Sequence, residues 1–472
     1  MTQVRRSKQL PFAAAAFAVV VAMVLVILAP AGDLAASPEG SPGARGVGDL
    51  YFPELGNGGY AVEHYRLDLT WGADERYLSG VTTIRAVTTQ NLSRFNLDLV
   101  GMEVEAVTVD RRPAAFERAG RELVITPDQV IEQGQRFVTE VTYHGHPTPI
   151  RMGTDLFALG WQTRGREAYV VSEPGGAATF FPVNDHPSDK ATFTVRVTAP
   201  NDQTVAANGR LARREEVGEG ATAWTYEVRD PMASYLLQVA IGDYELVDGG
   251  TVEGVVLRHA FHRRWATEGR VATETTAAMI RFLAGVFGPY PFEAYGVLVV
   301  DDDLGFALET QTLTVMGREL VVQGRGADIT LLHELAHQWF GNSVSVAGWN
   351  DIWLNEGFAT YAEWIYQERS GGPTAAALAQ QAAAEEGLNI PPGDPGRDEL
   401  FAPSVYLRGG RTLQALRETV GDGAFFEILR TWVSERAGAN GSTADFIALA
   451  EAISGQRLGD LFQSWLYNPT SP

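Results

Sequence analysis

The amino-acid sequence predicts a multidomain protein in which an antiparallel β-sandwich domain precedes an α+β domain that is mainly helical. From about Tyr60 to Tyr244, short runs of alternating apolar and polar residues are rich in Val, Thr and Tyr, and Gly, Pro or Asn-Gly separates them. Alternation with a period of two is typical of strands that bury one face. The clearest runs are 64–69, 81–87, 104–109, 137–143 and 192–197.

Past Asp248 the spacing of apolar residues lengthens to that of helices. Two short apolar strands, Val297–Val300 and Leu308–Val315, are predicted before the main helical region. A stretch of strands followed by a stretch of helices is typical of an all-β domain in front of an α+β domain. Helices are predicted over 268–287, 327–341, 352–369, 373–386, 405–419, 423–434, 443–453 and 458–467.

These patterns divide the chain into four parts. We expect a targeting segment over 1–31, a linker over 32–50, the β domain over 51–246 and the second domain over 247–472. Gly, Pro, Ser and Ala dominate the linker, and this composition is typical of flexible connections.

The N-terminal segment has the features of an export signal. Arg5, Arg6 and Lys8 form a positively charged start, and the apolar run Phe12–Ala29 follows. A run of about 18 residues also just reaches the length of a membrane-spanning helix. We therefore expect either a cleaved signal peptide or an uncleaved anchor, with the rest of the chain exported and either secreted or held at the membrane by this segment alone.

Composition excludes several classes of function. The chain has 472 residues, of which 45% are hydrophobic, and a formal net charge of −21 at pH 7. A nucleic-acid partner is not expected, because binding phosphates requires a basic surface. The sequence contains no cysteine, which excludes thiol catalysis and thiolate metal sites.

One motif points to metal chemistry. Residues 328–342 read DITLLHELAHQWFGN, and the pair His333 and His337 is four residues apart on a predicted helix. Both imidazoles should therefore project from one helix face at a spacing that suits a single ion. Glu334 lies beside them and could act as general base on a metal-activated water. The five-residue pattern His-Glu-x-x-His also arises by chance in helices.

A third ligand strengthens the prediction. Residues 349–363 read WNDIWLNEGFATYAE, and 18 residues separate His337 from Glu356. Two histidines and one carboxylate leave a fourth position open, which is the pattern of a catalytic zinc site with one Zn²⁺ per chain. Glu363 is a candidate partner for a ligand or a solvated helix-face charge, and Asp351 is a weaker candidate of the same kind.

On these residues the sequence resembles the zinc aminopeptidases that include aminopeptidase N and the leukotriene epoxide hydrolase, within the gluzincins. The 18-residue gap and the stretch WLNEGFATY carry the resemblance, which extends from about Tyr60 to Tyr467. It implies a saddle-like N-terminal β domain and a thermolysin-like catalytic domain. It also implies a short form without the C-terminal helical domain of larger members.

The resemblance further implies roles for five residues. Glu309 matches the principal anchor for the α-amine of the substrate, and Ala307 and Leu308 precede it in the same substrate-binding motif. Glu173 matches a second residue that helps to bind the amine. Tyr406, within VYLRGG, matches the tyrosine that donates a hydrogen bond to the tetrahedral oxyanion.

The sequence departs from the family pattern beside these residues. Phe306, Leu308 and Thr310 stand where the family usually has Gly, Met and Asn, so we expect a reshaped pocket on the S1 side. The segment 180–193, FFPVNDHPSDKATF, is similar to the family's substrate-domain segment that passes near the active site.

The expected function is therefore an aminopeptidase that acts on peptides with a free N-terminus. Two carboxylates would hold an ammonium group and reject a blocked or internal residue. An endopeptidase or an epoxide hydrolase on the same site remains an alternative, as does a non-catalytic binding module.

Overall fold

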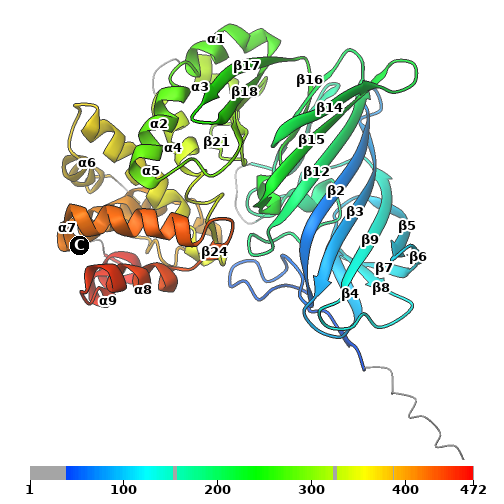
Figure 1. Cartoon of the computed structure of the whole chain (residues 1–472), viewed down its shortest axis with the longest axis horizontal. Coiled ribbons are helices and arrows are strands. Elements are labelled where there is room, and N and C mark those ends of the chain that lie inside the picture. Colours follow the sequence, from blue (N-terminus) through cyan, green and yellow to red (C-terminus); the bar gives the residue numbers. More distant parts are fainter. Residues whose placement is uncertain (1–38, 153–156, 323–326, 386, 471–472) are drawn as a thin grey trace, which may run out of the picture. The chain divides into compact units, whose positions relative to one another are not determined.

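The computed structural model describes residues 39–152, 157–322, 327–385 and 387–470. Strands fill the first half of this range, and helices dominate after about residue 265 (Figure 1). The fold class predicted from the sequence is confirmed by this order of elements.

The β domain is built on one eight-stranded sheet with the order β14-β15-β12-β2-β3-β9-β5-β6. All five clearest sequence runs are strands of this sheet. The only parallel pairing in it joins β2 to β12, among the described residues. The strands are β2 (Tyr60–Gly72), β3 (Tyr77–Thr88), β5 (Glu103–Val109), β6 (Arg112–Pro113), β9 (Arg136–Gly145), β12 (Ala191–Pro200), β14 (Arg210–Glu216) and β15 (Ala221–Met232).

Burial along β2 shows why the sequence specifies this sheet. Tyr60 and Val62 are buried, and beyond a bulge between Val62 and His64 the buried positions change to Tyr65 and Leu67. A bulge inserts one residue and so moves the following side chains to the opposite face. The buried side chains before and after the bulge therefore face the same core, although the buried positions move from even to odd residue numbers.

Two four-stranded sheets complete the β domain. The first has the order β1-β4-β8-β7, with β1 (Ser41–Pro42), β4 (Leu92–Asp98), β7 (Ala115–Ala119) and β8 (Glu122–Thr126). The second has the order β10-β11-β16-β13, with β10 (Gly160–Arg164), β11 (Glu167–Val171), β13 (Thr204–Ala207) and β16 (Val239–Gly242).

The second domain contains a six-stranded sheet that the sequence revealed only in part. The predicted boundary at residue 247 falls inside β17, which forms an antiparallel hairpin with β18. The predicted strand 308–315 is two strands, β21 and β22, joined by a turn. The strands are β17 (Tyr244–Val252), β18 (Val255–His262), β19 (Ala294–Tyr295), β20 (Val297–Val300), β21 (Ala307–Leu308) and β22 (Thr314–Gly317).

The helices follow most of the predicted ranges. The short helix α3 was not predicted, and the helix predicted over 327–341 ends at Ala336. The helix predicted over 268–287 is interrupted by a turn, and the two predicted over 405–434 form one element, α7, with a break at Gly421, where φ is 79°. The helices are α1 (Ala266–Ala272), α2 (Thr276–Phe287), α3 (Arg318–Val322), α4 (Ala327–Ala336), α5 (Trp353–Arg369), α6 (Ala375–Ala382), α7 (Pro403–Glu435), α8 (Thr443–Ser454) and α9 (Gly459–Phe462).

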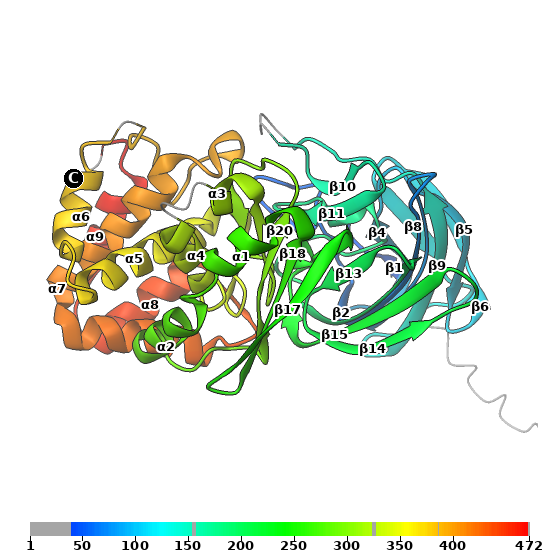
Figure 2. The same cartoon turned by 90° about the horizontal axis from the view of Figure 1, so that it is seen from above.

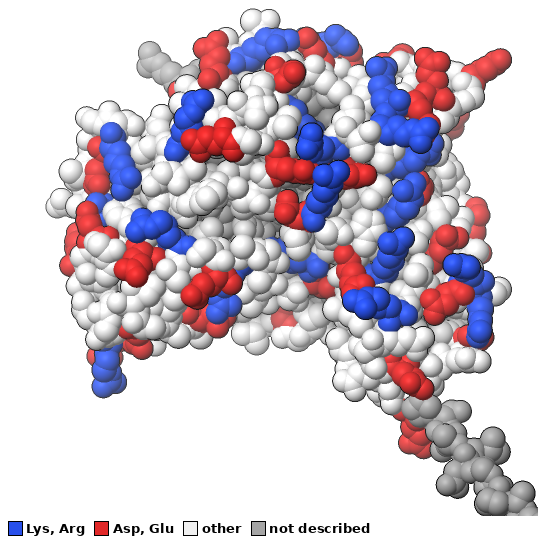
Figure 3. Space-filling model, in the orientation of Figure 1, with Lys and Arg blue, Asp and Glu red and all other residues white. Residues whose placement is uncertain are grey.

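Figures 1 and 2 show how these layers are arranged. In both views the six-stranded sheet lies between helices α4–α9 and the large sheet of the β domain. On the face shown in Figure 3, acidic and basic side chains are interspersed over both domains. Within the described ranges, no helix has the length and apolar character needed to cross a membrane. The predicted targeting segment lies outside the described residues.

The flexible linker predicted over 32–50 stays a prediction. In its described part, residues 39–50, most residues are exposed, but Gly43, Gly46 and Asp49 are buried. The buried Asp49 accepts hydrogen bonds from the amides of Tyr51, Phe52 and Trp349, each at 2.8 Å. Its carboxylate also accepts from His186 Nε2 at 3.1 Å. Burial opposes ionisation of Asp49, but these hydrogen bonds outweigh it and lower the pKa to about 2.

The residues that follow Asp49 reach a distant loop of the catalytic domain. Tyr51 donates from its hydroxyl to Asp394 at 2.5 Å and accepts from the amide of Gly396 at 3.1 Å. Arg397 forms an ion pair with Glu54 at 2.8 Å. We call residues 49–54 the strap, because they join the β domain to the loop that leads into α7.

We predict that Asp49→Asn lowers the free energy of unfolding at pH 7 by about 2 kcal/mol, because an amide group would face N–H donors. The lowered pKa of Asp49 means that its carboxylate stabilises the fold above about pH 4 and loses that effect as pH falls toward 2. Urea unfolding should therefore give a smaller difference between variant and wild type at pH 3 than at pH 7. Asp68→Asn, in an exposed ion pair with Arg66, is the control and should cost less than about 0.5 kcal/mol. Equal losses for Asp49→Asn at both pH values would contradict the prediction.

Candidate active site

The three predicted metal ligands meet in the structure. Nε2 of His333 lies 3.2 Å from Oε2 of Glu356, and Nε2 of His337 lies 3.3 Å from the same oxygen. The ligand atoms of the three residues all lie within 4.8 Å of one another. His333 is on α4, and His337 follows the helix end but keeps its amide bonded to the carbonyl of His333 at 3.2 Å. Both rings therefore project to one side, as predicted.

The outer nitrogen of each histidine is also held. Nδ1 of His333 donates to Glu363 at 2.6 Å, and Nδ1 of His337 donates to the carbonyl of Phe340 at 3.0 Å. Such partners fix the tautomer, so that Nε2 carries the lone pair that a metal requires. Glu363, one of the candidate partners for a ligand, thus bonds to His333. Asp351 has a different role, because its carboxylate accepts from Thr443 at the start of α8.

This donor set fits zinc. Two imidazoles and one carboxylate converge in a buried site, and the outer nitrogen of each imidazole has its own hydrogen-bond partner. Burial opposes ionisation of Glu356, but the neighbouring histidines outweigh it and lower its pKa to about 2, so its oxygens are available as ligands.

Three further carboxylates surround the metal ligands. Glu334, Glu309 and Glu173 are all buried and line the same cavity. Burial raises the pKa of Glu334 to about 8, although the two histidines oppose the shift. Burial also raises the pKa of Glu309, and burial with the charge of Glu309 raises that of Glu173 well above its usual range.

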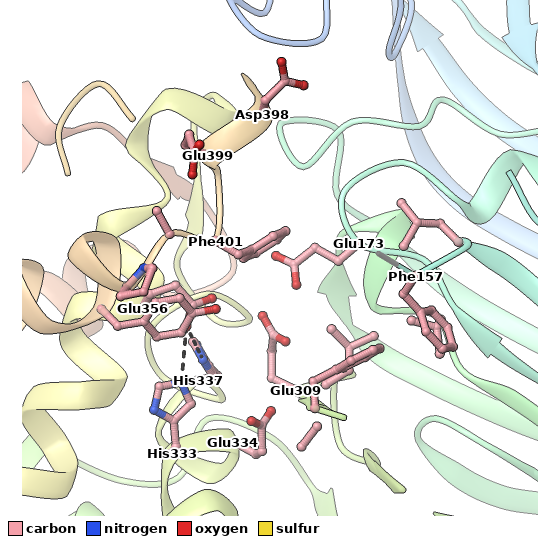
Figure 4. Close-up of a pocket in the computed structure, with 18 residues that line it drawn as sticks. Phe157, Glu173, Glu309, His333, Glu334, His337, Glu356, Asp398, Glu399 and Phe401 are labelled. Atoms are coloured by element: carbon pink, nitrogen blue, oxygen red, sulfur yellow. Dashed lines mark hydrogen bonds and ion pairs between the residues drawn. The ribbon is translucent and has the colours of Figure 1, made fainter. Parts of the chain in front are cut away.

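Glu173 and Glu309 each have one carboxylate oxygen that is buried and bonded to nothing in the described structure. Both side chains point into the cavity beside the metal ligands (Figure 4). One oxygen of each of these carboxylates and one of Glu356 lie within 4.8 Å of one another. Buried oxygens without a partner are costly, so a cation that enters the cavity would find acceptors ready for it.

Tyr406 approaches the metal site from α7. Its ring lies over that of His333, with centroids 6.0 Å apart and planes inclined by 26°. This position depends on a close approach of α5 and α7. A Cβ placed on Gly357 would lie 2.9 Å from Cα of Gly409, which no real side chain tolerates without a shift. The absence of side chains at both glycines lets α7 come near enough to place Tyr406 beside the ligands.

The cavity has a volume of about 560 Å³ and an apolar wall opposite the metal ligands. Phe157 of the β domain and Phe306 pack edge to face, with centroids 5.1 Å apart, and Ala307 and Leu308 continue this wall. The other side is lined by residues of the loop held by the strap and of the start of α7, namely Asp398, Glu399, Phe401, Ala402 and Pro403. Among the described residues that line the cavity, none is Lys or Arg.

The segment 180–193 is not among the described residues that line the cavity. It lies where the two domains join. The ammonium of Lys190 donates to the carbonyls of Asn342 and Ser343 at 2.8 and 3.0 Å, just beyond the ligand His337. The segment therefore meets the metal site through that turn, and sequence similarity alone did not reveal this contact.

We predict that Glu363→Gln weakens zinc binding by roughly tenfold to a hundredfold, because His333 would lose the carboxylate that orients and polarises it. Competition with a chromophoric chelator would measure the affinity. Glu427→Gln changes an exposed glutamate of α7 and should leave the affinity unchanged. If Glu363→Gln bound zinc as tightly as the wild type, Glu363 would have no role in holding the metal.

Two family models match the chain. The Peptidase family M1 domain matches residues 271–465, and the Peptidase M1 N-terminal domain matches residues 61–236. Aminopeptidase M1 of Arabidopsis thaliana is 28% identical over 319 residues, which are 62% of this chain and 36% of that protein. Aminopeptidase M1-B of Oryza sativa is 27% identical over 318 residues, again 62% of this chain and 36% of that protein. The chain thus spans about a third of the length of these curated relatives.

Solved structures match over nearly the whole described chain. The crystal structure of the M1 zinc metallopeptidase from Deinococcus radiodurans is 35% identical, with a TM-score of 0.85, and the match covers 90% of this chain and 98% of that one. Yeast LTA4 hydrolase, at 22% identity and a TM-score of 0.72, shares the fold over 88% of this chain and 69% of that chain. With the zinc ligands and both domain matches in place, the chain belongs to the M1 family of zinc metallopeptidases.

Proposed function

We propose that this protein is a zinc-dependent aminopeptidase that removes N-terminal residues from peptides with a free α-amine. The observation that carries the proposal is the pair of unpartnered oxygens on Glu173 and Glu309, buried beside the metal ligands. An ammonium group is the cation that a peptide brings to such a place. Charge-assisted hydrogen bonds to two carboxylates would hold it and leave the first peptide bond next to the metal ligands.

The same pair of carboxylates disfavours the alternatives. An endopeptidase would have to bring a mid-chain carbonyl oxygen against Glu173 and Glu309, which is electrostatically unfavourable. A non-catalytic binding module has no need for a general base, yet Glu334 and Tyr406 both line the cavity. An epoxide hydrolase activity has only the fold likeness to yeast LTA4 hydrolase to support it, and fold does not imply function.

Each residue then has a defined task in peptide hydrolysis. When bound, zinc supplies a Lewis acid and lowers the pKa of a coordinated water to about 7. Glu334 accepts the proton of the attacking water and can deliver it to the departing amine. Tyr406 donates a hydrogen bond to the oxygen on which negative charge develops, and this interaction is strongest in the transition state.

Relatives support peptides as the substrate class. A mutant of the Deinococcus radiodurans enzyme has been solved with Tyr-Ser-Ala bound, and two-domain M1 mutant structures contain L-arginine and L-tryptophan. Those ligands all carry a free α-amine. The cavity of this chain, at about 560 Å³, falls in the range of pockets that hold small molecules of that size.

Matched peptides in free-amine and N-acetylated forms would test the proposal, with mass spectrometry to locate the cuts and a chelator control. We expect single N-terminal residues to leave the free-amine peptides alone. Glu334→Gln should abolish turnover and still bind one zinc, because it removes the proton acceptor and spares the ligands. Equal cutting of both peptide forms at internal bonds would exclude the aminopeptidase. Full activity of Glu334→Gln would exclude its role as base.

Export of the chain is a separate proposal, and it rests on the sequence of residues 1–31. A positively charged start followed by an apolar run directs translocation, whether the segment is later removed or stays as an anchor. Fractionation of producing cells, with detection of the catalytic domain by antibody, should find it outside the cytoplasm. Recovery of the full-length chain in the cytoplasm would contradict export.

A further inference from the structure

The backbone carbonyl of Glu309 is held by two side chains from the turn that follows the zinc ligand His337. Nε2 of Gln338 donates to this carbonyl at 3.0 Å, and Nδ2 of Asn342 donates to it at 2.7 Å. Both side chains are fully buried. No motif analysis assigned either residue a function, although both lie within the sequence stretch that revealed the metal site.

Glu309 needs this support because its own strand ends before it. The ladder between β21 and β22 pairs Ala307 with Met316 and Leu308 with Val315, and Glu309 lies beyond the last pair. The chain then turns sharply through Thr312, where φ is 66°. A non-glycine residue rarely adopts a positive φ unless its surroundings hold it there.

Gln338 holds this turn from both sides. Its Oε1 accepts a hydrogen bond from the amide of Thr312 at 2.9 Å, while its Nε2 donates to Glu309. One side chain therefore bridges the first and fourth residues of the segment 309–312. Because both ends of its amide are used, the position of Gln338 fixes the position of Glu309.

The donors are themselves part of the metal site. The amide of Asn342 bonds to the carbonyl of His337 at 3.0 Å, and the amide of Ser343 bonds to the carbonyl of Gln338 at 3.1 Å. At the far end, Lys190 donates to the carbonyls of Asn342 and Ser343. The turn is thus a short, closed unit with a zinc ligand at one end.

We propose that Gln338 and Asn342 are positioning residues that set the distance between the amine anchor Glu309 and the zinc ligand His337, and so determine which peptide bond is cut. This inference rests on the proposed aminopeptidase function. When the distance between the ammonium site and the zinc ligands is fixed, only the carbonyl of the first peptide bond can reach the metal site while the ammonium is bound. If Glu309 moves while the zinc ligands stay in place, a substrate can no longer place its ammonium at Glu309 and its scissile carbonyl at the metal site at the same time.

A purely structural role would give a different result from a positioning role. If the two amides only satisfied a buried carbonyl, their loss would lower stability and reduce activity toward every substrate alike. If they position Glu309, their loss would affect only substrates that carry the α-amine. A substrate pair that differs in this one group separates the two roles.

The test uses Gln338→Met and Asn342→Leu in the full chain, each close in shape to the original side chain and unable to donate. Steady-state kinetics would compare a free-amine peptide with its analogue in which hydrogen replaces the α-amine. We expect KM for the free-amine peptide to rise by roughly tenfold to a hundredfold, with a smaller change in kcat. We expect kcat/KM for the des-amino analogue to change little, so the preference for the free amine falls by a similar factor.

Two controls accompany the kinetics. Zinc content should stay at one equivalent in both variants, because the ligands and their outer partners are untouched. Gln414→Met changes another buried glutamine, which bonds to Tyr361 and Glu418 away from the cavity, and should keep the wild-type preference. If a variant fails to fold, Asn342→Ser, with a side chain too short to reach Glu309, provides the same comparison.

The outcomes separate the inference from the proposed function. A wild-type protein without any preference for the free amine overturns the proposed function and the inference with it. A wild-type protein with that preference, and variants that keep it while losing activity toward both substrates equally, overturns the inference alone. Loss of zinc in proportion to the loss of activity also overturns it, since the two residues would then support the metal and not the anchor.

Discussion

The site depends above all on the neutralisation of buried negative charge. Glu173, Glu309, Glu334 and Glu356 are all buried around one cavity, and none of the described lining residues is Lys or Arg. Burial alone favours the protonated form of each carboxyl. Zinc and, in the proposed function, the ammonium group of a substrate are the cations that would neutralise this charge. Metal binding and substrate selection are therefore two results of one electrostatic arrangement.

The two cations require different kinds of support from the fold. The zinc ligands come from α4, its following turn and α5, whose backbones are held by their own hydrogen bonds and whose histidines are oriented by Glu363 and Phe340. The proposed amine anchors, Glu173 and Glu309, come from the connection after β11 and the end of β21, where regular structure stops. Beyond the end of a strand, side chains must supply the hydrogen bonds that a neighbouring strand would otherwise make. Gln338 and Asn342 do so for the backbone carbonyl of Glu309.

The sequence pattern predicted those features of the structure that depend on residues close together in the chain. The main strands of the large sheet and the ligands His333, His337 and Glu356 follow from residue spacing, because period and spacing act over a few residues or along helices. Composition predicted a linker up to residue 50 and could not reveal that Asp49 bonds to Trp349, 300 residues away. The hairpin of β17 and β18 was missed because its centre is rich in Asp and Gly. Glu173, Glu309 and Tyr406 were found only through resemblance, since no spacing rule joins them to the metal motif.

The contact between Gly357 and Gly409 has a consequence for how this enzyme could diversify. It joins the helix of the ligand Glu356 to the helix of Tyr406 at backbone distance, so neither group can shift without the other. A side chain added at either glycine would therefore disturb this unit of two packed helices and both of its functional groups at once. Mutations at Phe157 and Phe306, which meet across the domain junction, leave that unit intact. Variation among descendants of this chain should accumulate in the wall that meets the substrate side chain, so new preferences can arise while the hydrolytic machinery is inherited unchanged.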